Sequence, residues 1–488
     1  MIVVGGGNAA LCAALAAREH SDRVLIVERA PLEEAGGNSR FTAGAMRVVY
    51  NGVADLKELI PDLTDGEIAQ TDFGTYREGQ FFDDMGRITQ YRCDPDLTEL
   101  LVRKSFETLA WMRTKGVRFV PIWGRQAFKV DGRFKFWGGL TVETWGGGEG
   151  LVDALTKAAQ KQEIDIWYAT PAVALLHDDD GVRGVRVKRA GKMVDVLGKS
   201  VVLAGGGFQA NPEWRARYLG PNWELAKVRG TRFNTGDVIR MALDIGAAAA
   251  GNWSGCHAVG WERNAPEFGD LRIGDQFQKH SYPWGIMVNA EGQRFVDEGA
   301  DFRNYTYAKY GRAILNQTGQ FAWQIFDRKV LRLLRDEYRI REVTKVSANT
   351  LEELAKKLDD VDADSALAEI NTYNRAVNQE VPFNPNVKDG RGTVGLPVNK
   401  TNWANTIDEP PFEAYAVTCG ITFTFGGLKV DTGARVISTD GDAIPGLYAA
   451  GELVGGIFYF NYPGGTGLTS GAVFGRIAGT NAVRGSSR

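Results

Sequence analysis

Three small residues and one carboxylate near the start of the chain have the types and spacing needed to bind a nucleotide. Gly5 and Gly7 lie in the run VVGGGNAAL, and Ala10 follows them. Such glycines allow a tight turn and let backbone amides approach a pyrophosphate, while a small third residue lets the following helix pack closely on its sheet. Glu28 ends the apolar run VLIVE, where a carboxylate can accept hydrogen bonds from both ribose hydroxyls and would repel the 2′-phosphate of NADP. Glycine turns also occur in sheets that bind no nucleotide, but strand, turn, helix and carboxylate here appear in order. The pattern predicts a dinucleotide site with contacts from Gly5, Gly7, Asn8, Ala9, Ala10, Glu28 and Arg29.

The composition is that of a globular enzyme. The 488 residues suffice for two or three domains, and the net charge of −3 gives no reason to expect nucleic acid as a partner. The four cysteines lie far apart without CxxC spacing, so we expect no metal site. Few residues precede Gly5 and no long apolar run is present, so we expect neither a secretion signal nor a membrane span, and a cytoplasmic location.

Two further regions are predicted to complete the nucleotide-binding sheet. Residues 166–176, 181–189 and 193–207 predict an antiparallel hairpin followed by a buried strand that ends in small residues. Residues 443–456, AIPGLYAAGELVGG, predict a strand that ends at Gly451 and Glu452, and residues 469–483 predict a helix. An ordinary strand, turn and helix would explain this last periodicity equally well.

The segment GGNSRFTAGAMR, residues 36–47, resembles the segments of soluble fumarate reductases that wrap the pyrophosphate and flavin of FAD. With the other motifs it identifies the chain as a member of the superfamily that includes succinate dehydrogenase and fumarate reductase flavoproteins, 3-ketosteroid Δ1-dehydrogenases and tricarballylate dehydrogenases. The resemblance implies noncovalent FAD, because this region holds no His. It implies further cofactor contacts from Gly37, Asn38, Ser39, Ala43, Gly44, Ala204, Gly205, Gly206, Gly451, Glu452, Thr466, Gly467 and Leu468.

The same resemblance implies the domain organisation. The fold class is α/β: a two-dinucleotide-binding, Rossmann-like FAD domain with an inserted α+β substrate cap domain. The FAD domain is expected over residues 1–251 and 418–488, and the cap over residues 252–417.

A cap segment, residues 285–312, resembles the fumarate reductase segment in which an Arg exchanges a proton with substrate. Alignment of this segment makes Arg303 the candidate. A surface ion pair with Asp297, Glu298 or Asp301 is the alternative. Because a guanidinium is a poor base in isolation, Tyr305, Tyr307 and Tyr462 are kept as alternative proton carriers.

Other segments depart from the fumarate reductase pattern. QFQKHSYPW, with Lys279 and His280, replaces the expected Glu-x-x-Arg proton relay; ITFTFGG places Phe423, and NYPGGT places Tyr462, where carboxylate-binding His and Arg are expected. These changes argue against fumarate or succinate as the substrate. The YPGG run resembles the 3-ketosteroid Δ1-dehydrogenases, in which a Tyr at this place abstracts a proton, whereas RNYTYAKYGR and residues 451–479 resemble tricarballylate dehydrogenases.

A tricarboxylate needs several cations or amide donors, for which arginine is well suited. Candidate substrate ligands are Arg47, Arg232, His280, Gly464 and Gly465, and Arg229, Arg263 and Arg272 are further candidates. Each single arginine among them is more often a solvated surface charge than a ligand, but as a group some should face the site. His257 is either a catalytic residue that orients substrate or a core histidine.

The preferred hypothesis is oxidation of tricarballylate, or a related polycarboxylate, to cis-aconitate by proton abstraction and hydride transfer to FAD. A ketosteroid-type dehydrogenase, a reductase of an unsaturated acid and a flavin-binding subunit without redox chemistry are the alternatives. The resemblance implies an electron acceptor that is a membrane-associated iron–sulfur and haem protein, or a quinone, so the chain could lie at the periphery of the inner membrane.

Overall fold

The computed structural model describes residues 1–21 and 23–485. Its first layer is a six-stranded sheet with the order β20-β21-β13-β1-β2-β9. All neighbouring strands are parallel except β20 and β21. Val3 is in register with Val202 on one side and Ile26 on the other, so the first strand is central and buried. The strands are β1 Ile2–Val4, β2 Leu25–Val27, β9 Asp165–Trp167, β13 Val201–Leu203, β20 Arg435–Ile437 and β21 Ala443–Ala449.

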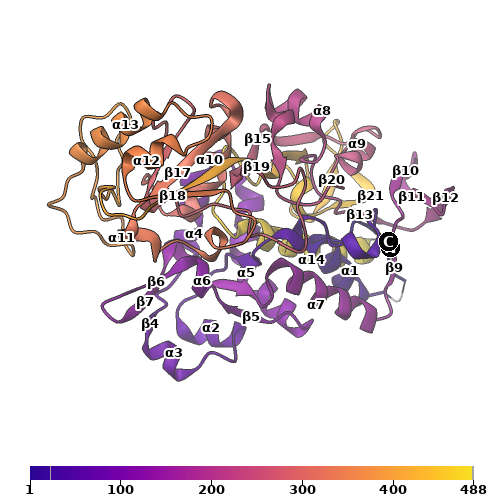
Figure 1. The fold of residues 1–488 in the computed structure, drawn as a ribbon. Helices are drawn as coiled ribbons and strands as arrows, with labels where there is room; N and C mark the ends of the chain where they lie inside the picture. Colours follow the sequence, from indigo (N-terminus) through magenta and orange to yellow (C-terminus); the bar gives the residue numbers. More distant parts are fainter. Residues whose placement is uncertain (22, 486–488) are drawn as a thin grey trace.

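Small residues allow two helices of this domain to pack in direct contact. Helix α1 (Asn8–Arg18) lies against α14 (Thr466–Arg484), which presents Gly471, Gly475 and Gly479 at four-residue intervals. A Cβ at Gly475 would lie 2.4 Å from the Ala9 carbonyl oxygen, so the backbones are too close for any side chain there. The two helices therefore lie side by side (Figure 1).

A separate antiparallel sheet, β10-β11-β12, projects at one end of the molecule (Figure 1). Its strands are β10 Ala172–Asp178, β11 Gly181–Arg189 and β12 Lys192–Leu197. The predicted hairpin and the buried strand that follows it, β13, are therefore confirmed.

The second layer is a mixed sheet built on two long strands. β15 (Ala249–Glu262) and β19 (Phe412–Leu428) pair antiparallel, from Ala249 with Leu428 to Glu262 with Val417. The expected boundaries at 251/252 and 417/418 fall inside these strands rather than in linkers. The sheet continues with β14 Lys227–Val228, β16 Ile286–Val288, β17 Phe321–Phe326 and β18 Lys345–Ala348.

Helices cover the mixed sheet and fill the space between the layers. α10 (Arg303–Leu315) packs on β15 and β19, while α12 (Leu351–Lys356) and α13 (Ala363–Ala376) form the far end of the cap (Figure 1). The segment between β2 and β9 contributes α4 Glu78–Ile88, α5 Pro95–Thr114, α6 Trp123–Gln126 and α7 Gly147–Lys161. In the described part of the chain, no helix combines the length and apolar character needed to cross a membrane.

Candidate active site

A long cavity runs from the first sheet to the cap. It encloses about 1940 Å³ of empty space, including its mouth, and is lined by residues from both layers. The loops that follow β1, β2, β13 and β21, and the amino termini of α1 and α14, form one half. Ligands of open parallel sheets bind at the carboxyl ends of the strands, and this half lies there.

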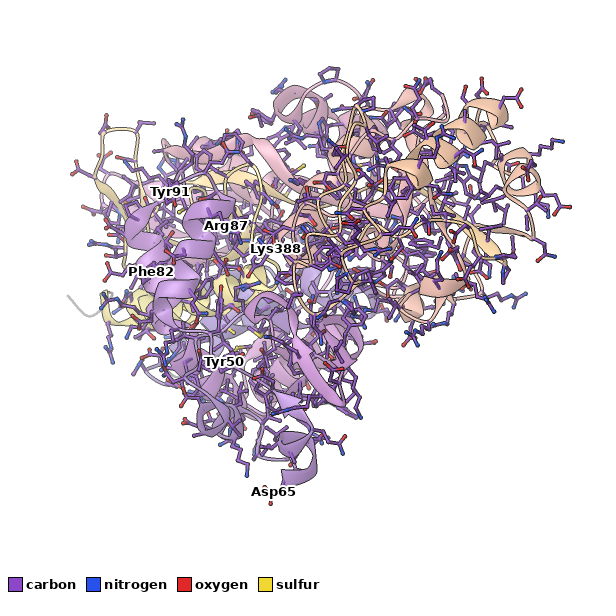
Figure 2. The ribbon with its side chains drawn as sticks, turned by 90° about the vertical axis from the view of Figure 1, so that its left-hand side faces the viewer. Tyr50, Asp65, Phe82, Arg87, Tyr91 and Lys388 are labelled. Carbon is purple, nitrogen blue, oxygen red and sulfur yellow. The ribbon has the colours of Figure 1, made fainter. Side chains whose placement is uncertain are left out.

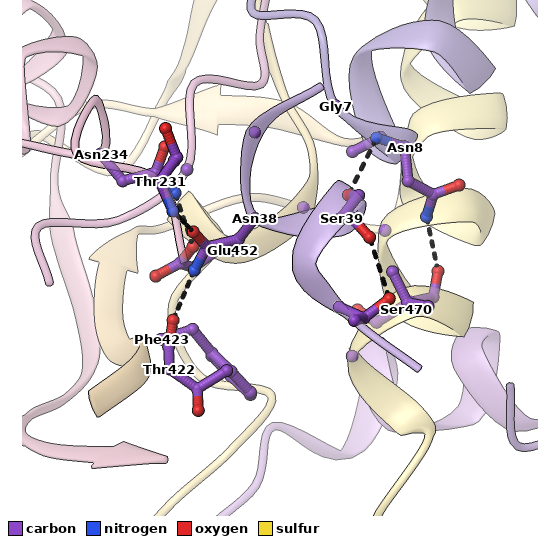
Figure 3. Close-up of a pocket in the computed structure, with 18 of the residues that line it drawn as sticks. Gly7, Asn8, Asn38, Ser39, Thr231, Asn234, Thr422, Phe423, Glu452 and Ser470 are labelled. Atoms are coloured by element: carbon purple, nitrogen blue, oxygen red, sulfur yellow. Dashed lines mark hydrogen bonds between the residues drawn. The ribbon is translucent and has the colours of Figure 1, made fainter. Parts of the chain in front are cut away.

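The amino terminus of α1 forms the expected phosphate cradle. Gly5 has a φ of 117° and would place a Cβ 2.4 Å from the Ala204 carbonyl oxygen, so only glycine fits this turn. The Asn8 amide donates to the Ser39 hydroxyl at 3.1 Å, and the Asn8 side chain donates to the Leu468 carbonyl at 2.8 Å (Figure 3). The helix dipole at such an end favours a bound pyrophosphate.

Glu28 is buried at the end of β2 and faces this cradle. Its carboxylate accepts a hydrogen bond from the Ala30 amide at 2.7 Å, and a Cβ at Gly6 would lie 2.7 Å from its second oxygen. Burial raises the pKa of Glu28, although backbone amides oppose the effect. At this position the Glu28 carboxylate can accept hydrogen bonds from two ribose hydroxyls, and it would repel a 2′-phosphate.

Glu452 lines the cavity. It accepts hydrogen bonds from the Thr424 amide at 3.0 Å and from the side chains of Gln209 and Asn234 at 3.2 and 3.3 Å (Figure 3). Burial raises the pKa of Glu452 to about 7. The carboxyl group is therefore held in place to bind the hydroxyls of a polyol chain.

Most residues expected at the cofactor do line the cavity. They are Gly5, Gly7, Asn8, Ala9, Glu28, Arg29, Gly37, Asn38, Ser39, Ala43, Ala204, Gly205, Gly206, Gly451, Glu452, Gly467 and Leu468. Ala10, Gly44 and Thr466 do not line the cavity. Ala10 is completely buried in α1, and Gly44 packs against Thr144. The Thr466 hydroxyl donates to the Pro463 carbonyl at 2.6 Å.

The cap half of the cavity contains three arginines, two of which share one carboxylate. Asp275 accepts from Arg229 at 2.7 Å, from Arg125 at 3.0 Å and from Gln278 at 2.9 Å. Arg303, the first residue of α10, also lines this end and donates to the Arg125 carbonyl. Burial lowers the pKa of Arg303, which makes its guanidinium a better proton donor than a solvated one. Arg303 is not paired with Asp297, Glu298 or Asp301, the alternative left open by the sequence.

Aromatic rings form the opposite wall of this end. Tyr307 and Tyr462 share a hydrogen bond between their hydroxyls, and Phe423 packs against Tyr462. Burial raises the pKa of both tyrosines, opposite to the direction that a phenolic base requires. Gly464 and Gly465 line the wall next to them.

The two histidines differ in their access to the cavity. His280 lines it, and its Nε2 atom has no hydrogen-bond partner. His257 is completely buried behind the wall, stacked on Phe423 with ring centroids 5.3 Å apart, and neither ring nitrogen has a partner. Burial lowers the pKa of both imidazoles well below the usual value, so both are neutral near pH 7.

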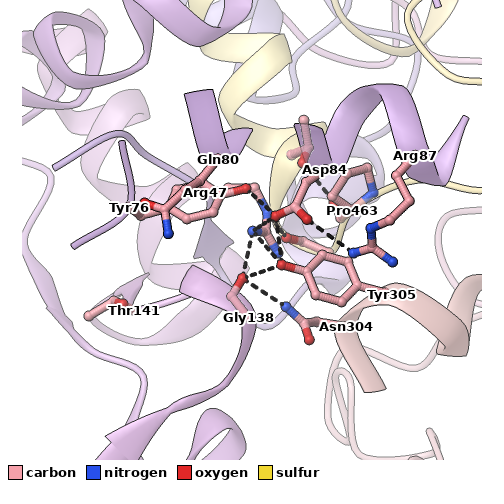
Figure 4. A network of polar contacts seen from close by, with 12 residues as sticks. Arg47, Tyr76, Gln80, Asp84, Arg87, Gly138, Thr141, Asn304, Tyr305 and Pro463 are labelled. Carbon is pink, nitrogen blue, oxygen red and sulfur yellow. Dashed lines mark hydrogen bonds and ion pairs between the residues drawn. The ribbon is translucent and has the colours of Figure 1, made fainter. Parts of the chain in front are cut away.

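Arg47 and Tyr305 form a separate network outside the cavity wall. Arg47 is completely buried and donates to the carbonyls of Gly464 and Gly138 at 3.0 and 2.8 Å (Figure 4). Asp84 of α4 lies 3.5 Å from Arg47 and accepts from Tyr305 at 2.7 Å. Burial would lower the pKa of Arg47, but Tyr76, Tyr305 and Asp84 raise it. Arg47, expected as a substrate ligand, and Tyr305, expected as a proton carrier, therefore lie outside the cavity and support its wall.

The other charged candidates also lie away from the cavity. Arg232 is on the surface and pairs with Glu34 at 2.6 Å; Arg263 and Arg272 pair with Asp360 and Asp270. Lys279 is buried beside Glu262 and donates to backbone carbonyls. Of the further arginine candidates, Arg229 alone reaches the site.

Sequence reasoning missed several residues of the cap end, chiefly Arg125, Asp275 and Gln278. Arg125 belongs to a short helix with no recognisable motif. Gln278 lies in the segment QFQKHSYPW that departs from the family pattern, and Asp275 immediately precedes that segment; this departure was the available signal.

The chain is similar over nearly its whole length to known flavoproteins. The family model "FAD binding domain" matches residues 1–468. A probable fumarate reductase of Shewanella frigidimarina is 31% identical over 493 residues, covering 99% of this chain and 74% of that protein.

Solved structures give the same result. The open conformation of a flavocytochrome c3 fumarate reductase has a TM-score of 0.74 and 27% identity, covering 100% of this chain and 78% of the other. The 3-ketosteroid Δ1-dehydrogenase of Sterolibacterium denitrificans has a TM-score of 0.75 and 22% identity, covering 99% of both chains, a likeness that extends to the fold alone.

Proposed function

Because the chain belongs to the FAD-binding domain family of the fumarate reductase and succinate dehydrogenase flavoproteins, we propose that it transfers hydride between FAD and the C–C bond next to a substrate carboxylate. The protein is an FAD-dependent oxidoreductase. The cradle at α1, Glu28 and Glu452 fit the pyrophosphate, ribose and ribitol of FAD, which supplies or accepts the hydride when bound.

One observation carries the proposal: Arg303 and the amino terminus of α14 line one cavity, and they are joined where the Gly464 amide, just before α14, donates to the carbonyl of Asn304, the residue after Arg303, at 2.7 Å. In this family fold that helix end faces the flavin ring, so Arg303 would lie across the substrate from it. Arg303 can then exchange a proton with one carbon while the neighbouring carbon exchanges hydride with the cofactor. The cations and amides at this end stabilise the enolate-like charge that develops on the carboxylate.

For the substrate, we keep tricarballylate and cis-aconitate as the first pair to test. The match of RNYTYAKYGR and residues 451–479 to tricarballylate dehydrogenases supports it. Arg125, Arg229 and Arg303 supply the charge that a polycarboxylate needs, reduced by Asp275. The relative named as a fumarate reductase favours the opposite direction, reduction of an unsaturated acid.

A second candidate is a ketosteroid-type dehydrogenase. The Tyr307–Tyr462 hydrogen bond and the apolar rings of Phe423 and Phe458 favour it, because a paired phenol can bind a ketone oxygen and rings can pack on a steroid. The three arginines at the same end count against it.

The electrons must be exchanged with a second acceptor or donor. We propose a membrane-associated iron–sulfur and haem protein or a quinone, as in the tricarballylate dehydrogenases that the chain resembles. The flavocytochrome similarity supports an electron-transfer partner without identifying it.

The test is anaerobic absorbance of the FAD-loaded protein at the flavin band. Oxidised protein is titrated separately with tricarballylate, succinate and a 3-ketosteroid; dithionite-reduced protein is mixed with cis-aconitate and fumarate. Bleaching by tricarballylate, or reoxidation by either unsaturated acid, supports the proposal. Bleaching by the steroid alone supports the second candidate, and no response to any of them overturns both.

A further inference from the structure

Three buried polar side chains line the cavity, and each has an atom without a hydrogen-bond partner among the described residues. They are Gln126 of α6, His280 of the loop before β16, and Asn304 of α10. Their exposed fractions are 5%, 4% and 1%, and the atoms are Oε1, Nε2 and Oδ1 respectively. Buried polar atoms are nearly always paired, so three unpaired ones in one cavity indicate a ligand that pairs them.

The side-chain amide of Asn304 is held in one orientation. Its Nδ2 atom donates to the Gly138 carbonyl at 3.4 Å, so its Oδ1 atom lies on the other side of the amide (Figure 4). Exchanging the two atoms would place Oδ1 against the Gly138 carbonyl, and two acceptors cannot form a hydrogen bond. The backbone is fixed as well, because the Asn304 carbonyl accepts from the Gly464 amide at 2.7 Å. Asn304 therefore offers an acceptor to a ligand rather than a donor.

The three side chains lie among the cations that would bind a substrate carboxylate. Asn304 directly follows Arg303 in α10. Gln126 directly follows Arg125 in α6, and Arg303 donates to the Arg125 carbonyl, so the two segments are in contact. Burial, together with the charge of Arg303, lowers the pKa of His280, so its ring is neutral near pH 7 and can accept a hydrogen bond at one nitrogen. This end of the cavity therefore offers acceptors as well as cations.

A substrate that carries carboxylates alone cannot pair these acceptors. An ionised carboxylate accepts hydrogen bonds and has none to donate. It would bind the arginines and leave the Asn304 oxygen buried and unpaired, which lowers affinity. A substrate ammonium group could donate, but it would lie beside Arg303 and Arg125, and like charges repel. The suitable donor is therefore a neutral one, and a hydroxyl group is the smallest.

We propose that the substrate is a carboxylic acid that also carries a hydroxyl group, and that the Asn304 Oδ1 atom accepts a hydrogen bond from this hydroxyl. The inference rests on the proposed function and narrows its substrate class to hydroxy acids. The amide of Gln126 and the neutral ring of His280 can each donate or accept, so they complete the hydrogen bonds of the hydroxyl oxygen. The arginines hold the carboxylate, and Asn304 fixes a second point of the carbon chain. Together they determine which C–C bond faces the flavin.

The experiment measures dissociation constants of acids from the oxidised, FAD-loaded protein by isothermal titration calorimetry, a readout that needs no turnover. The probes are two matched pairs, succinate with malate and tricarballylate with citrate, in which the second acid adds one hydroxyl to the first. In the wild type the hydroxy acid of at least one pair should bind about tenfold more tightly, the gain expected from one hydrogen bond to a buried acceptor. 2-Methoxysuccinate keeps the added oxygen without its proton and should bind no more tightly than succinate.

Asn304→Leu removes the acceptor and keeps the volume of the side chain. In the pair that shows the preference, the ratio of the two dissociation constants should fall from about 10 to below about 2, while the acid without a hydroxyl binds as in the wild type. Gln126→Leu should lower the same ratio by less. The matched control is Asn386→Leu: Asn386 is also a buried amide with an unpartnered Oδ1 atom, but it donates to the Phe128 carbonyl at 3.2 Å and does not line the cavity. The control should change neither constant.

Equal affinity for both members of each pair in the wild type overturns the inference. A hydroxyl preference that survives in both Asn304→Leu and Gln126→Leu also overturns it, and a lower FAD content in Asn304→Leu would then identify the cofactor as the group that these acceptors bind. If Asn304→Leu does not retain FAD, the ratio in Gln126→Leu decides. The proposed function fails separately: the absence of any bleaching or reoxidation by acids in the anaerobic assay overturns it, whichever acids bind.

Discussion

The carboxylate of Asp275 lies 2.7 Å from the guanidinium of Arg229, in the cavity wall and almost completely shielded from water. Since Arg125 shares the same carboxylate, two of the three arginines at the cap end are already paired. Of these three arginines, Arg303 is the one whose positive charge is not paired with Asp275. The pocket is therefore less positive than its arginines suggest.

Replacing Asp275 should change selectivity for substrate charge. Asp275→Asn removes one negative charge beside the bound acid, so affinity for tricarballylate or cis-aconitate should rise about tenfold more than affinity for a monocarboxylate. Flavin-perturbation titrations measure both. Asp270→Asn, which breaks a surface pair with Arg272, is the control and should alter neither. A uniform loss for all acids would show that Asp275 serves only to position the arginines.

Arg303 should be essential for turnover but not for the cofactor. Arg303→Lys keeps a cation yet shortens its reach, so turnover should fall by about 10² to 10⁴ while FAD content stays at the wild-type level. Steady-state rates and the flavin-to-protein absorbance ratio measure the two effects. Arg272→Lys provides the comparison, because Arg272 is 87% exposed and does not line the cavity. Full activity in Arg303→Lys would move the proton transfer to another residue.

The tyrosine pair distinguishes the two candidate functions. Because burial raises the pKa of Tyr462 and Tyr307, an acid substrate handled by Arg303 should lose less than about tenfold in kcat in Tyr462→Phe. A ketone substrate that depends on the phenol should lose about 100-fold or more. Tyr307→Phe removes the same hydrogen bond from the other side and serves as the partner variant. Measuring kcat and KM separately shows whether the hydroxyl acts in chemistry or in binding.

The raised pKa of Glu452 predicts a stability that falls as pH rises. The folded carboxyl titrates near 7 and the unfolded one near its ordinary 4.5, so between these values the folded state keeps a proton that the unfolded state has lost. The free energy of unfolding of the FAD-free protein should therefore drop across this window, by up to about 3 kcal/mol from this group. Thermal melts at pH 5 and pH 8 test it. In Glu452→Gln the free energy of unfolding should fall less between pH 5 and pH 8 than in the wild type. An unchanged pH dependence would mean that other groups cause the fall.

The network around Arg47 should be a stability determinant. Asp84→Ala leaves the guanidinium buried without its carboxylate, which typically costs about 3 to 5 kcal/mol. Urea unfolding measures the loss, and Asp83→Ala, an exposed neighbour on the same helix, should cost little. A cost below about 1 kcal/mol for Asp84→Ala would mean that the backbone carbonyls suffice for Arg47.

The same network joins α4 to the cap. Arg87 of α4 and Lys388 of the cap both pair with Asp301, at 2.6 and 3.5 Å, and Figure 2 shows their side chains next to each other. Asp301 precedes Arg303 by two residues, so the start of α10 is held from both sides. Arg87→Ala should therefore raise KM several-fold while FAD content stays near the wild-type level. Steady-state rates and the flavin-to-protein absorbance ratio measure the two effects.

The cofactor half of the site could be predicted from the sequence because its signals are local. Gly5, Gly7 and Glu28 belong to one βαβ unit, in which spacing along the chain fixes position in space. The strand β21 and the helix α14 could be predicted in the same way, since each is a single element with a regular period, although β21 ends at Ala449 and Glu452 lies in the turn that follows it.

The substrate half could not be predicted because irregular backbone decides it. Arg229 and Arg232 are three residues apart, yet one lines the cavity and the other lies on the surface. Gly230 between them has a φ of 155°, and a Cβ there would lie 2.1 Å from Asn38, so the chain changes direction at a point that no periodicity reveals. The place of Arg47 at the end of the flavin segment predicts a position near the substrate. In the structure Arg47 instead turns toward Asp84, which belongs to the helix α4, and no local pattern reveals that partner.

The pairing of β15 with β19 has a practical consequence for engineering. Both strands run through the expected domain boundaries, and most of their ladder, from Asn252 with Phe425 to Trp261 with Thr418, joins the cap side of one boundary to the FAD side of the other. A chimaera that exchanges the cap at 251/252 and 417/418 would take the two strands of this ladder from different parents, so that the side chains paired across it would no longer match. Junctions placed at the outer ends of the two strands keep the ladder in one parent, and only such chimaeras should fold and remain monodisperse.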